Sequence, residues 1–166
     1  VYEWSGRYKQ EILLDWTVID SPMALLSSVE ILAASQRTNN DFPTAMGYAL
    51  GFAAGVIQRG PQCLYRTVDM AGDGQNNEGF GPDLAYAEFP FEGVTVNGLV
   101  VDEAGFDAKT DLINFYENHV IRGSGAFVEV AQGFEDYERA MRRKLERELT
   151  PPVVGSVARS DSLVNG

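Results

Sequence analysis

The sequence predicts an α/β protein, namely a three-layer α/β/α sandwich with a mostly parallel sheet and one antiparallel hairpin at the sheet edge. The chain has 166 residues, of which 45% are hydrophobic and 22% charged, and this is enough for one domain with a buried core. Strand-like and helix-like segments alternate along most of the chain. The segment VTVNGLVV at residues 94–101 has few polar interruptions, which is typical of a strand buried on both faces.

The chain is expected to open with a hairpin and a helix. Residues 1–4 and 11–18 have the composition of two strands with a polar turn between them. Asp20 or Ser21 can then cap a helix, and Pro22 suits its first position. The apolar stripe of this helix consists of Leu25, Leu26, Val29, Leu32 and Ala33.

A second helix is expected from Thr44 to about Gln58, closed by Gly60. Three glycines recur at every fourth position of this helix and give it a smooth face for close packing: Gly47, Gly51 and Gly55. We expect that face to lie against a sheet or another helix.

The remaining elements alternate between strands and helices. Strands are expected at residues 65–71, 94–101 and 125–131, and helices follow them before Pro90, at 111–121 and at 134–149. Asp69 lies inside the first of these strands and needs a partner if it is buried. The last helix carries basic residues towards its end, which matches the helix dipole: Arg142, Arg143, Lys144 and Arg147.

Charge and composition exclude several classes of protein. A net charge of −11 argues against nucleic-acid binding, which depends on Lys and Arg contacts with phosphate. The single cysteine, Cys63, excludes an internal disulfide and a cysteine-based zinc cluster, and the single histidine, His119, excludes a multi-histidine metal site. The apolar runs are short and broken by glycine, so no membrane-spanning segment is expected.

The loop after the strand at 65–71, in TVDMAGDGQNNEG, is the main candidate for a functional site. Ligands of parallel sheets bind at the carboxyl ends of the strands, where this loop lies. A phosphate cradle is disfavoured, because Asn77 stands where the dinucleotide-binding pattern requires glycine. A glycine-rich turn without a ligand and a cation site remain. Asp73 and the hydroxyl of Thr44 favour the cation site, because hard cations prefer oxygen ligands.

Several motifs resemble one family in their order along the chain: DWTVIDSP, PTAMGYALGFAA, RTVDMAGDGQNNEG, FYENHVIRGSGAFV and RRKLERE. Together they are similar to the bacterial DUF1194 family, a branch of the von Willebrand factor type A (vWA) domains, over residues 1–149. The resemblance implies a metal-ion-dependent adhesion site in which Thr44 and Asp73 bind Mg²⁺ or Ca²⁺. One coordination position of that cation would be open to a partner's carboxylate. It also implies a periplasmic or secreted location.

The resemblance further implies a strand that these residues do not contain. In vWA domains a DxSxS motif follows a strand in the middle of the sheet, and no DxSxS occurs in this sequence. The hairpin and the other three strands are therefore expected to leave unpaired edges, which a separate chain or segment would fill. We expect a domain at residues 1–149 and a C-terminal tail at residues 150–166.

Five residues around the predicted cation site are candidates for partner binding. Phe42 and Phe80 flank the site and could form its apolar rim. Asn76, Asn77 and Glu78 could contact the cation or its ligand, although bracing of the loop by these side chains is the favoured interpretation.

The sequence therefore predicts a non-enzymatic, vWA-like module that binds a protein partner through a divalent cation. The alternative is a structural subunit of a larger assembly with a vestigial metal site, which docks by its acidic surface and its C-terminal tail. A metal-dependent hydrolase is less well supported, because no base or nucleophile is recognisable beside Asp73.

Overall fold

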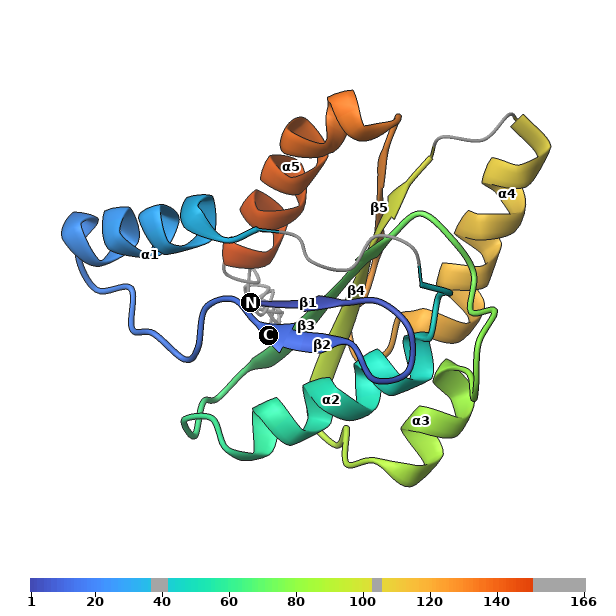
Figure 1. Ribbon diagram of the computed structural model, residues 1–166, viewed down its shortest axis with the longest axis horizontal. Coiled ribbons are helices and arrows are strands. Elements are labelled where there is room, and N and C mark those ends of the chain that lie inside the picture. The colour runs from blue at the N-terminus through green and yellow to red at the C-terminus, as the bar shows by residue number, and fades with distance from the viewer. Residues whose placement is uncertain (37–41, 103–105, 151–166) are drawn as a thin grey trace, which may run out of the picture.

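The computed structural model describes residues 1–36, 42–102 and 106–150. Its centre is a parallel sheet in the order β3 (Arg66–Gly72), β4 (Val94–Val101) and β5 (Val128–Ala131) (Figure 1). The antiparallel hairpin of β1 (Tyr2–Trp4) and β2 (Gln10–Ile12) forms a second sheet. The predicted α/β class, with a parallel sheet and an antiparallel hairpin, is confirmed.

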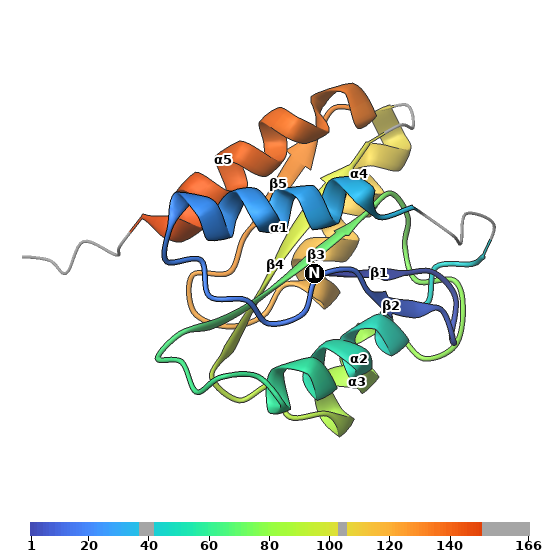
Figure 2. The same ribbon diagram turned by 60° about the vertical axis from the view of Figure 1, so that its left-hand side comes forward.

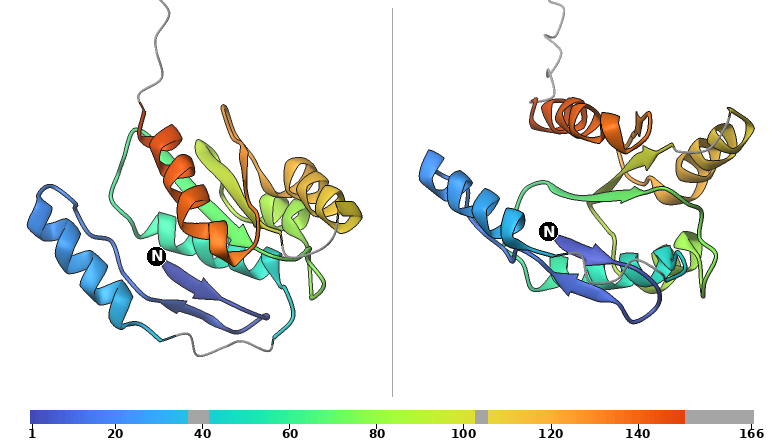
Figure 3. Two further views of the ribbon diagram at one scale, coloured as in Figure 1. Left: turned by 90° about the horizontal axis from the view of Figure 1, so that it is seen from above. Right: turned by 45° about the horizontal axis from the view of Figure 1, so that its top comes forward.

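Helices cover both faces of the parallel sheet (Figures 2 and 3). The larger core lies between one face and α2 (Met46–Gln58), α3 (Pro82–Glu88) and the π-helical turn η1 (Tyr116–Val120). The helix α5 (Tyr137–Leu149) packs on the opposite face, so the protein has three layers.

Two further helical segments complete the described chain. The helix α4 (Phe106–Phe115) runs directly into η1, and the short 3₁₀ turn η2 (Phe134–Asp136) leads into α5. The last helix was predicted to begin at Phe134, and the α-helix itself begins three residues later. Its start is displaced because Gly133, with a φ of 77°, turns the chain sharply after β5.

Strand β4 shows why the sheet sits at the centre of the core. Val96 and Val100 point into the larger core, whereas Leu99 packs with Ala131 and Ala140 towards α5. All residues of β4 except Thr95 are buried, as expected for a strand covered on both faces. The range predicted for this strand, residues 94–101, is confirmed.

The glycines of α2 allow close approach at two of three positions. A β-carbon on Gly47 would lie 2.2 Å from the Phe80 carbonyl oxygen, and one on Gly51 would lie 2.8 Å from the Phe89 ring. A β-carbon on Gly55 would meet no atom within 4 Å. The predicted smooth face therefore exists, and it ends before Gly55.

Two predicted boundaries were wrong for identifiable reasons. The second strand was expected to reach residue 18, but the backbone N–H groups of Leu13 and Leu14 both donate to the Val1 carbonyl oxygen. Two successive N–H groups thus share one acceptor, and the regular pairing with β1 ends at Ile12. Helix α2 begins at Met46 rather than at Thr44, because the Thr44 N–H and carbonyl are both engaged in hydrogen bonds to another loop.

The helix α1 (Pro22–Ala34) has the predicted cap but not a buried stripe. Ser21 Oγ accepts a hydrogen bond from the Ala24 N–H at 3.2 Å, and Pro22 is the first helical residue. Ser28 is the only buried residue of the helix, and Leu32 is partly buried. Its other large apolar side chains are at least half exposed: Met23, Leu25, Leu26, Val29 and Ile31. The helix extends along the edge of the molecule beyond the hairpin (Figures 1 and 3).

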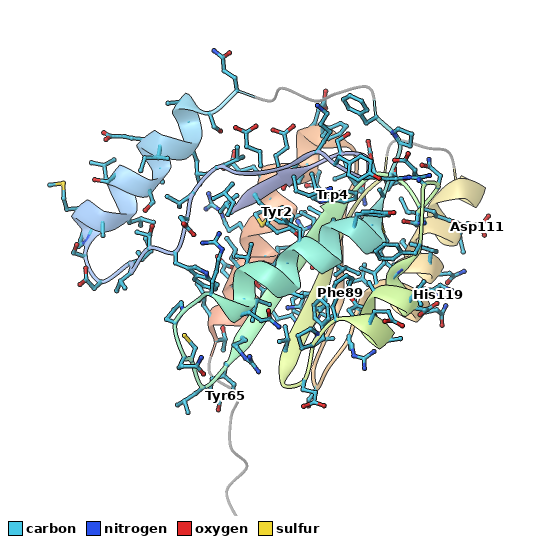
Figure 4. All side chains as sticks on the ribbon, turned by 60° about the horizontal axis from the view of Figure 1, so that its bottom comes forward. Tyr2, Trp4, Tyr65, Phe89, Asp111 and His119 are labelled. Carbon is cyan, nitrogen blue, oxygen red and sulfur yellow. The ribbon has the colours of Figure 1, made fainter. Side chains whose placement is uncertain are left out.

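No strand ladder joins β1 to β3 in the described part of the chain. Side chains connect them instead: the Tyr2 hydroxyl donates to the Ala49 carbonyl oxygen at 3.0 Å and lies 3.8 Å from Met70 Sδ. Figure 4 shows Tyr2 and Trp4 on the same strand of the hairpin, beside α2. Among the described residues, β1 and β3 each have one edge without a paired strand, and the strand that the family resemblance implies stays a prediction.

The helix α5 is tied to the sheet by a buried cation. Lys144 is fully buried, and its Nζ contacts the carboxylates of Asp69 on β3 and Glu148 on α5. Asn97 on β4 donates to Glu148 Oε1 at 2.7 Å and extends the network to the middle strand. The partner that Asp69 was predicted to need is thus Lys144. The assignment of Lys144 to the helix dipole alone was incomplete, because this side chain points into the sheet.

None of the helices in the described ranges is long and apolar enough to cross a membrane. Helix α5 ends at Leu149, and residues 151–166 of the predicted tail lie outside the described residues.

Candidate functional site

Two loops meet at the carboxyl end of β3. One runs from Phe42 to Ala45 before α2, and the other is the Asp73–Gly79 loop that follows β3. A β-carbon on Gly74 would lie 3.3 Å from Thr44 Oγ1, so the Thr44 hydroxyl faces the beginning of the second loop. The structure therefore brings the Thr44 and Asp73 loops together, as the sequence predicted.

Side chains and backbone of the second loop hold the first in place. Asn77 Oδ1 accepts from the Thr44 N–H at 2.8 Å, and the Asn77 N–H donates to the Thr44 carbonyl at 2.9 Å. Asn76 Oδ1 accepts from the Met46 N–H at 2.8 Å, which satisfies one of the free donors at the start of α2. Asn76 and Asn77 therefore brace the two loops, and the Oδ1 atoms of both are engaged in doing so.

The two oxygen groups proposed for a cation are not engaged. The Asp73 side chain is exposed, and neither its carboxylate nor Thr44 Oγ1 forms a hydrogen bond or an ion pair with any described residue. A carboxylate and a hydroxyl are both hard ligands suited to Mg²⁺ or Ca²⁺. Their lack of protein partners, on loops that are otherwise tightly bonded, fits a role towards something outside the described chain.

The donor set on these loops is small. Six or more oxygens surround Mg²⁺ or Ca²⁺, and waters and substrate groups commonly supply several of them. Within the described residues no group of three or more His, Cys, Asp or Glu side chains could hold a metal ion. Thr44 and Asp73 thus fit one side of a cation site, and the other ligands must be waters or groups from elsewhere.

A buried tyrosine approaches Gly72, the residue that precedes Asp73. Tyr116 is fully buried, and its hydroxyl has no hydrogen-bond partner among the described residues. The hydroxyl oxygen would lie 2.8 Å from a β-carbon on Gly72, the last residue of β3, and the ring would lie 2.7 Å from one on Gly98. Burial raises the pKa of the Tyr116 hydroxyl, and the negative charge of Asp73 raises it further. This hydroxyl therefore stays protonated and can act as a donor.

A hollow opens beside Asp73 on the face of the sheet covered by α5. Its volume is about 290 Å³, and it is lined by Ala71, Gly72, Asp73, Val101, Phe134 and Tyr137. Phe134 is half exposed, so the hollow has an apolar wall next to a free carboxylate. This hollow could not be predicted from the sequence, because its apolar wall comes from Phe134 in η2, 61 positions away from Asp73 along the chain.

The other predicted partner-binding residues have partners in the fold. Glu78 forms an ion pair with Arg7 of the hairpin turn at 3.1 Å. Phe80 packs on Tyr48, with ring centroids 4.4 Å apart, and against Gly47. Phe42 is 48% exposed, with Lys9 Nζ 5.4 Å from its ring centroid. Phe42 is thus the aromatic residue of the pair that remains accessible beside Thr44.

His119 contacts the first turn of a neighbouring helix. The residue lies in the last turn of η1, and its Nδ1 is 2.7 Å from Asp83 Oδ2 in the first turn of α3. Its ring also lies 5.3 Å from that of Phe115. Figure 4 shows His119 on the outer side of the molecule, well away from Tyr2 and Trp4.

Tyr116 is the residue at this site that the sequence analysis missed. It lies in a helix and reads as an ordinary core aromatic. The available signals were the two glycines, Gly72 and Gly98, which leave room for its side chain on neighbouring strands. Their relevance becomes clear only when the register of β3 and β4 is known.

These features define an α/β protein whose parallel sheet carries a hydroxyl and a carboxylate on two bonded loops at one strand end. The sequence pattern of the family described as Protein of unknown function (DUF1194) matches residues 1–153. The chain therefore belongs to the DUF1194 family, as its motifs indicated. No curated protein and no solved structure gives a match.

Proposed function

We propose that this protein is a non-enzymatic, vWA-like binding module that holds a divalent cation at Thr44 and Asp73 and through it recognises an acidic group of a protein partner. One observation carries the proposal: both oxygen groups are free of protein partners, although the loops that present them are held by bonds from Asn76 and Asn77. A preorganised loop with uncommitted hard oxygens is what a cation site requires.

The surroundings support recognition of a protein partner. The exposed ring of Phe42 lies two residues from Thr44, and the half-exposed Phe134 lines the hollow beside Asp73. Apolar contacts of this kind would supply binding energy around a charged centre. A periplasmic or secreted location belongs to the same proposal and rests on the family resemblance.

Cation binding can be measured directly on the protein. We expect Mg²⁺ or Ca²⁺ to raise the midpoint of thermal unfolding, and EDTA to reverse the increase. Tb³⁺ should report the same site by luminescence, because Tyr116 and Trp4 lie close to Gly72 and can transfer energy to an ion bound beside it. Asp73→Asn and Thr44→Val should each lose the effect. Asp83→Asn, which alters an exposed carboxylate bound to His119, should retain it. Equal responses of Asp73→Asn and Asp83→Asn would contradict the proposal.

A second candidate is a structural subunit that accepts a strand from another polypeptide segment. The position of β3 at the end of its sheet favours it, because no strand among the described residues pairs with the edge of β3 that faces away from β4. The exposed apolar side chains of α1 favour it as well, since a contiguous apolar helix face usually marks an interface.

The two candidates respond differently to the same treatments. A structural subunit should change its sedimentation coefficient when residues 150–166 are deleted, and it should ignore EDTA. A cation-dependent module should keep its cation response after that deletion. Sedimentation velocity of the whole chain and of the shortened chain, each with and without EDTA, separates them.

A further inference from the structure

The Tyr116 hydroxyl is a buried donor for which the fold provides no acceptor. A hydroxyl removed from water without a hydrogen bond costs about 1–3 kcal/mol, so its retention calls for an explanation. Trp4 Cζ2 and Met46 Cε lie within 4 Å of the position that a β-carbon on Gly72 would take, so apolar atoms surround the region that the hydroxyl faces. A phenylalanine would fill the same space without the polar atom.

Asp73 follows Gly72 directly, and Gly72 is the residue that the Tyr116 hydroxyl approaches. Burial raises the pKa of this hydroxyl, and the charge of Asp73 adds to the increase. No hydrogen bond joins the two residues, and the Asp73 side chain is exposed and unpaired within the described chain. The Tyr116 hydroxyl, a donor, and the Asp73 carboxylate, an acceptor, are therefore both close to Gly72, and neither has a hydrogen-bond partner among the described residues.

We propose that Tyr116 is a positioning residue for the candidate cation site: its hydroxyl would donate a hydrogen bond to the Asp73 carboxylate when Asp73 and Thr44 hold a cation. This inference rests on the proposed function. Carboxylate ligands of metals are commonly held by such outer hydrogen bonds, and loss of one typically weakens metal affinity about 10- to 100-fold.

Gly72 at the end of β3 and Gly98 in the middle of β4 are part of this arrangement. The Tyr116 ring crosses from Gly98 to Gly72, and a side chain at either position would overlap it. The π-helical turn that carries Tyr116 is itself an uncommon element that occurs frequently at functional sites. The backbone thus leaves space for the Tyr116 hydroxyl to reach the end of β3.

The test compares Tyr116→Phe with Tyr86→Phe. Tyr86 is also a core tyrosine, but its hydroxyl already donates to the Val120 carbonyl oxygen. In EDTA, Tyr116→Phe should be as stable as the wild type or more stable, because it removes an unsatisfied group, and Tyr86→Phe should be less stable. In Tb³⁺ and Mg²⁺ titrations, Tyr116→Phe should bind about 10-fold or more weakly, whereas Tyr86→Phe should match the wild type.

The possible results separate this inference from the proposed function. If the wild type binds no cation, the proposed function fails. If the wild type and Tyr116→Phe bind the cation equally while Asp73→Asn does not bind it, the cation site stands and the role of Tyr116 is overturned. If Tyr116→Phe is destabilised in EDTA as much as Tyr86→Phe, the hydroxyl has an acceptor within the fold and the inference is wrong.

Discussion

Thr44 and Asn77 hold each other through two hydrogen bonds, one from the Thr44 N–H to Asn77 Oδ1 at 2.8 Å and one from the Asn77 N–H to the Thr44 carbonyl at 2.9 Å. Replacement of Asn77 by Ala removes the first bond, so we expect the free energy of unfolding to fall by about 1 kcal/mol. Urea unfolding measures this change. Gln75→Ala serves as a control, because the exposed Gln75 side chain makes one longer bond, to the Asp111 carbonyl at 3.2 Å. Equal stability of Asn77→Ala and the wild type would show that the brace contributes nothing.

The glycines of α2 should respond oppositely to the same substitution. Gly47→Ala would place its β-carbon 2.2 Å from the Phe80 carbonyl oxygen, a backbone atom that cannot move aside easily. We expect a loss of about 1–3 kcal/mol. Gly55→Ala meets no atom within 4 Å and replaces glycine by the best helix former, so a gain of up to about 1 kcal/mol is expected. Denaturant unfolding of both variants measures these two changes in the free energy of unfolding. Destabilisation by Gly55→Ala would contradict the packing described.

The contact between Gly72 and Tyr116 can be tested with a double-mutant cycle. Gly72→Ala should cost about 1–3 kcal/mol, because its β-carbon would lie 2.8 Å from the Tyr116 hydroxyl oxygen. In the Tyr116→Phe background the same change should cost clearly less, since that oxygen is absent. The free energies of unfolding of the wild type, both single variants and the double variant give the coupling. Additive effects would mean that another atom limits the space at Gly72.

The Asp69–Lys144 pair predicts a particular pH dependence. Burial raises the pKa of Asp69 from 3.8 to about 6, and Lys144 offsets this effect only in part. Between pH 3.8 and about pH 6 the Asp69 carboxyl is largely protonated in the folded protein and largely ionised in the unfolded chain. This contribution therefore stabilises the fold at low pH and is lost as the pH rises from about 4 to about 6.

Asp69→Asn isolates that contribution, because its side chain is neutral throughout. The stability of the wild type relative to Asp69→Asn should fall between about pH 4 and pH 7, by on the order of 1 kcal/mol after allowance for the partly exposed side chain. The comparison is needed because Asp136 acts in the opposite direction. A hydrogen bond from the Gln132 N–H and the charge of Arg139 lower its pKa, so its contribution is lost as the pH falls. A pH-independent difference between wild type and Asp69→Asn would refute the prediction.

The apolar surface of α1 should contribute little to the stability of the isolated chain. Leu26 is 52% exposed, so we expect Leu26→Gln to change the free energy of unfolding by less than about 0.5 kcal/mol. Leu50 is fully buried on α2, and Leu50→Ala should cost about 2–5 kcal/mol. A large loss from Leu26→Gln would show that α1 packs against the rest of the chain.

The sequence predicted most of the fold, because the signals it carries are local. Ser21 and Pro22 determine the start of α1, and the uninterrupted apolar run at Val94–Val101 determines β4. Where the prediction was wrong, a distant residue decided the outcome. The β2 strand ends because the Val1 carbonyl accepts two bonds, and α2 starts late because Asn77 holds Thr44.

Only the two proposed cation ligands of the candidate site, Thr44 and Asp73, could be predicted from the sequence. Thr44 and Asp73 stand out as polar residues at element ends in an otherwise apolar sequence. Tyr116 does not stand out, because its importance depends on how β3 and β4 are aligned and on which side chains surround its hydroxyl. Lys144 likewise looked like one of several basic residues on a helix, and only the packing of α5 against β3 shows that it is buried.

The separation of the hairpin from the parallel sheet has a consequence for how the protein opens. The backbone hydrogen bonds of β1 and β2 form a network of their own, and the hairpin contacts the remainder through side chains and isolated bonds such as that from the Gly6 N–H to the Pro43 carbonyl. It can therefore detach without breaking any ladder of β3, β4 and β5. Its amide hydrogens should exchange with solvent through a low-energy local opening, while those of β4 exchange only when the whole domain unfolds.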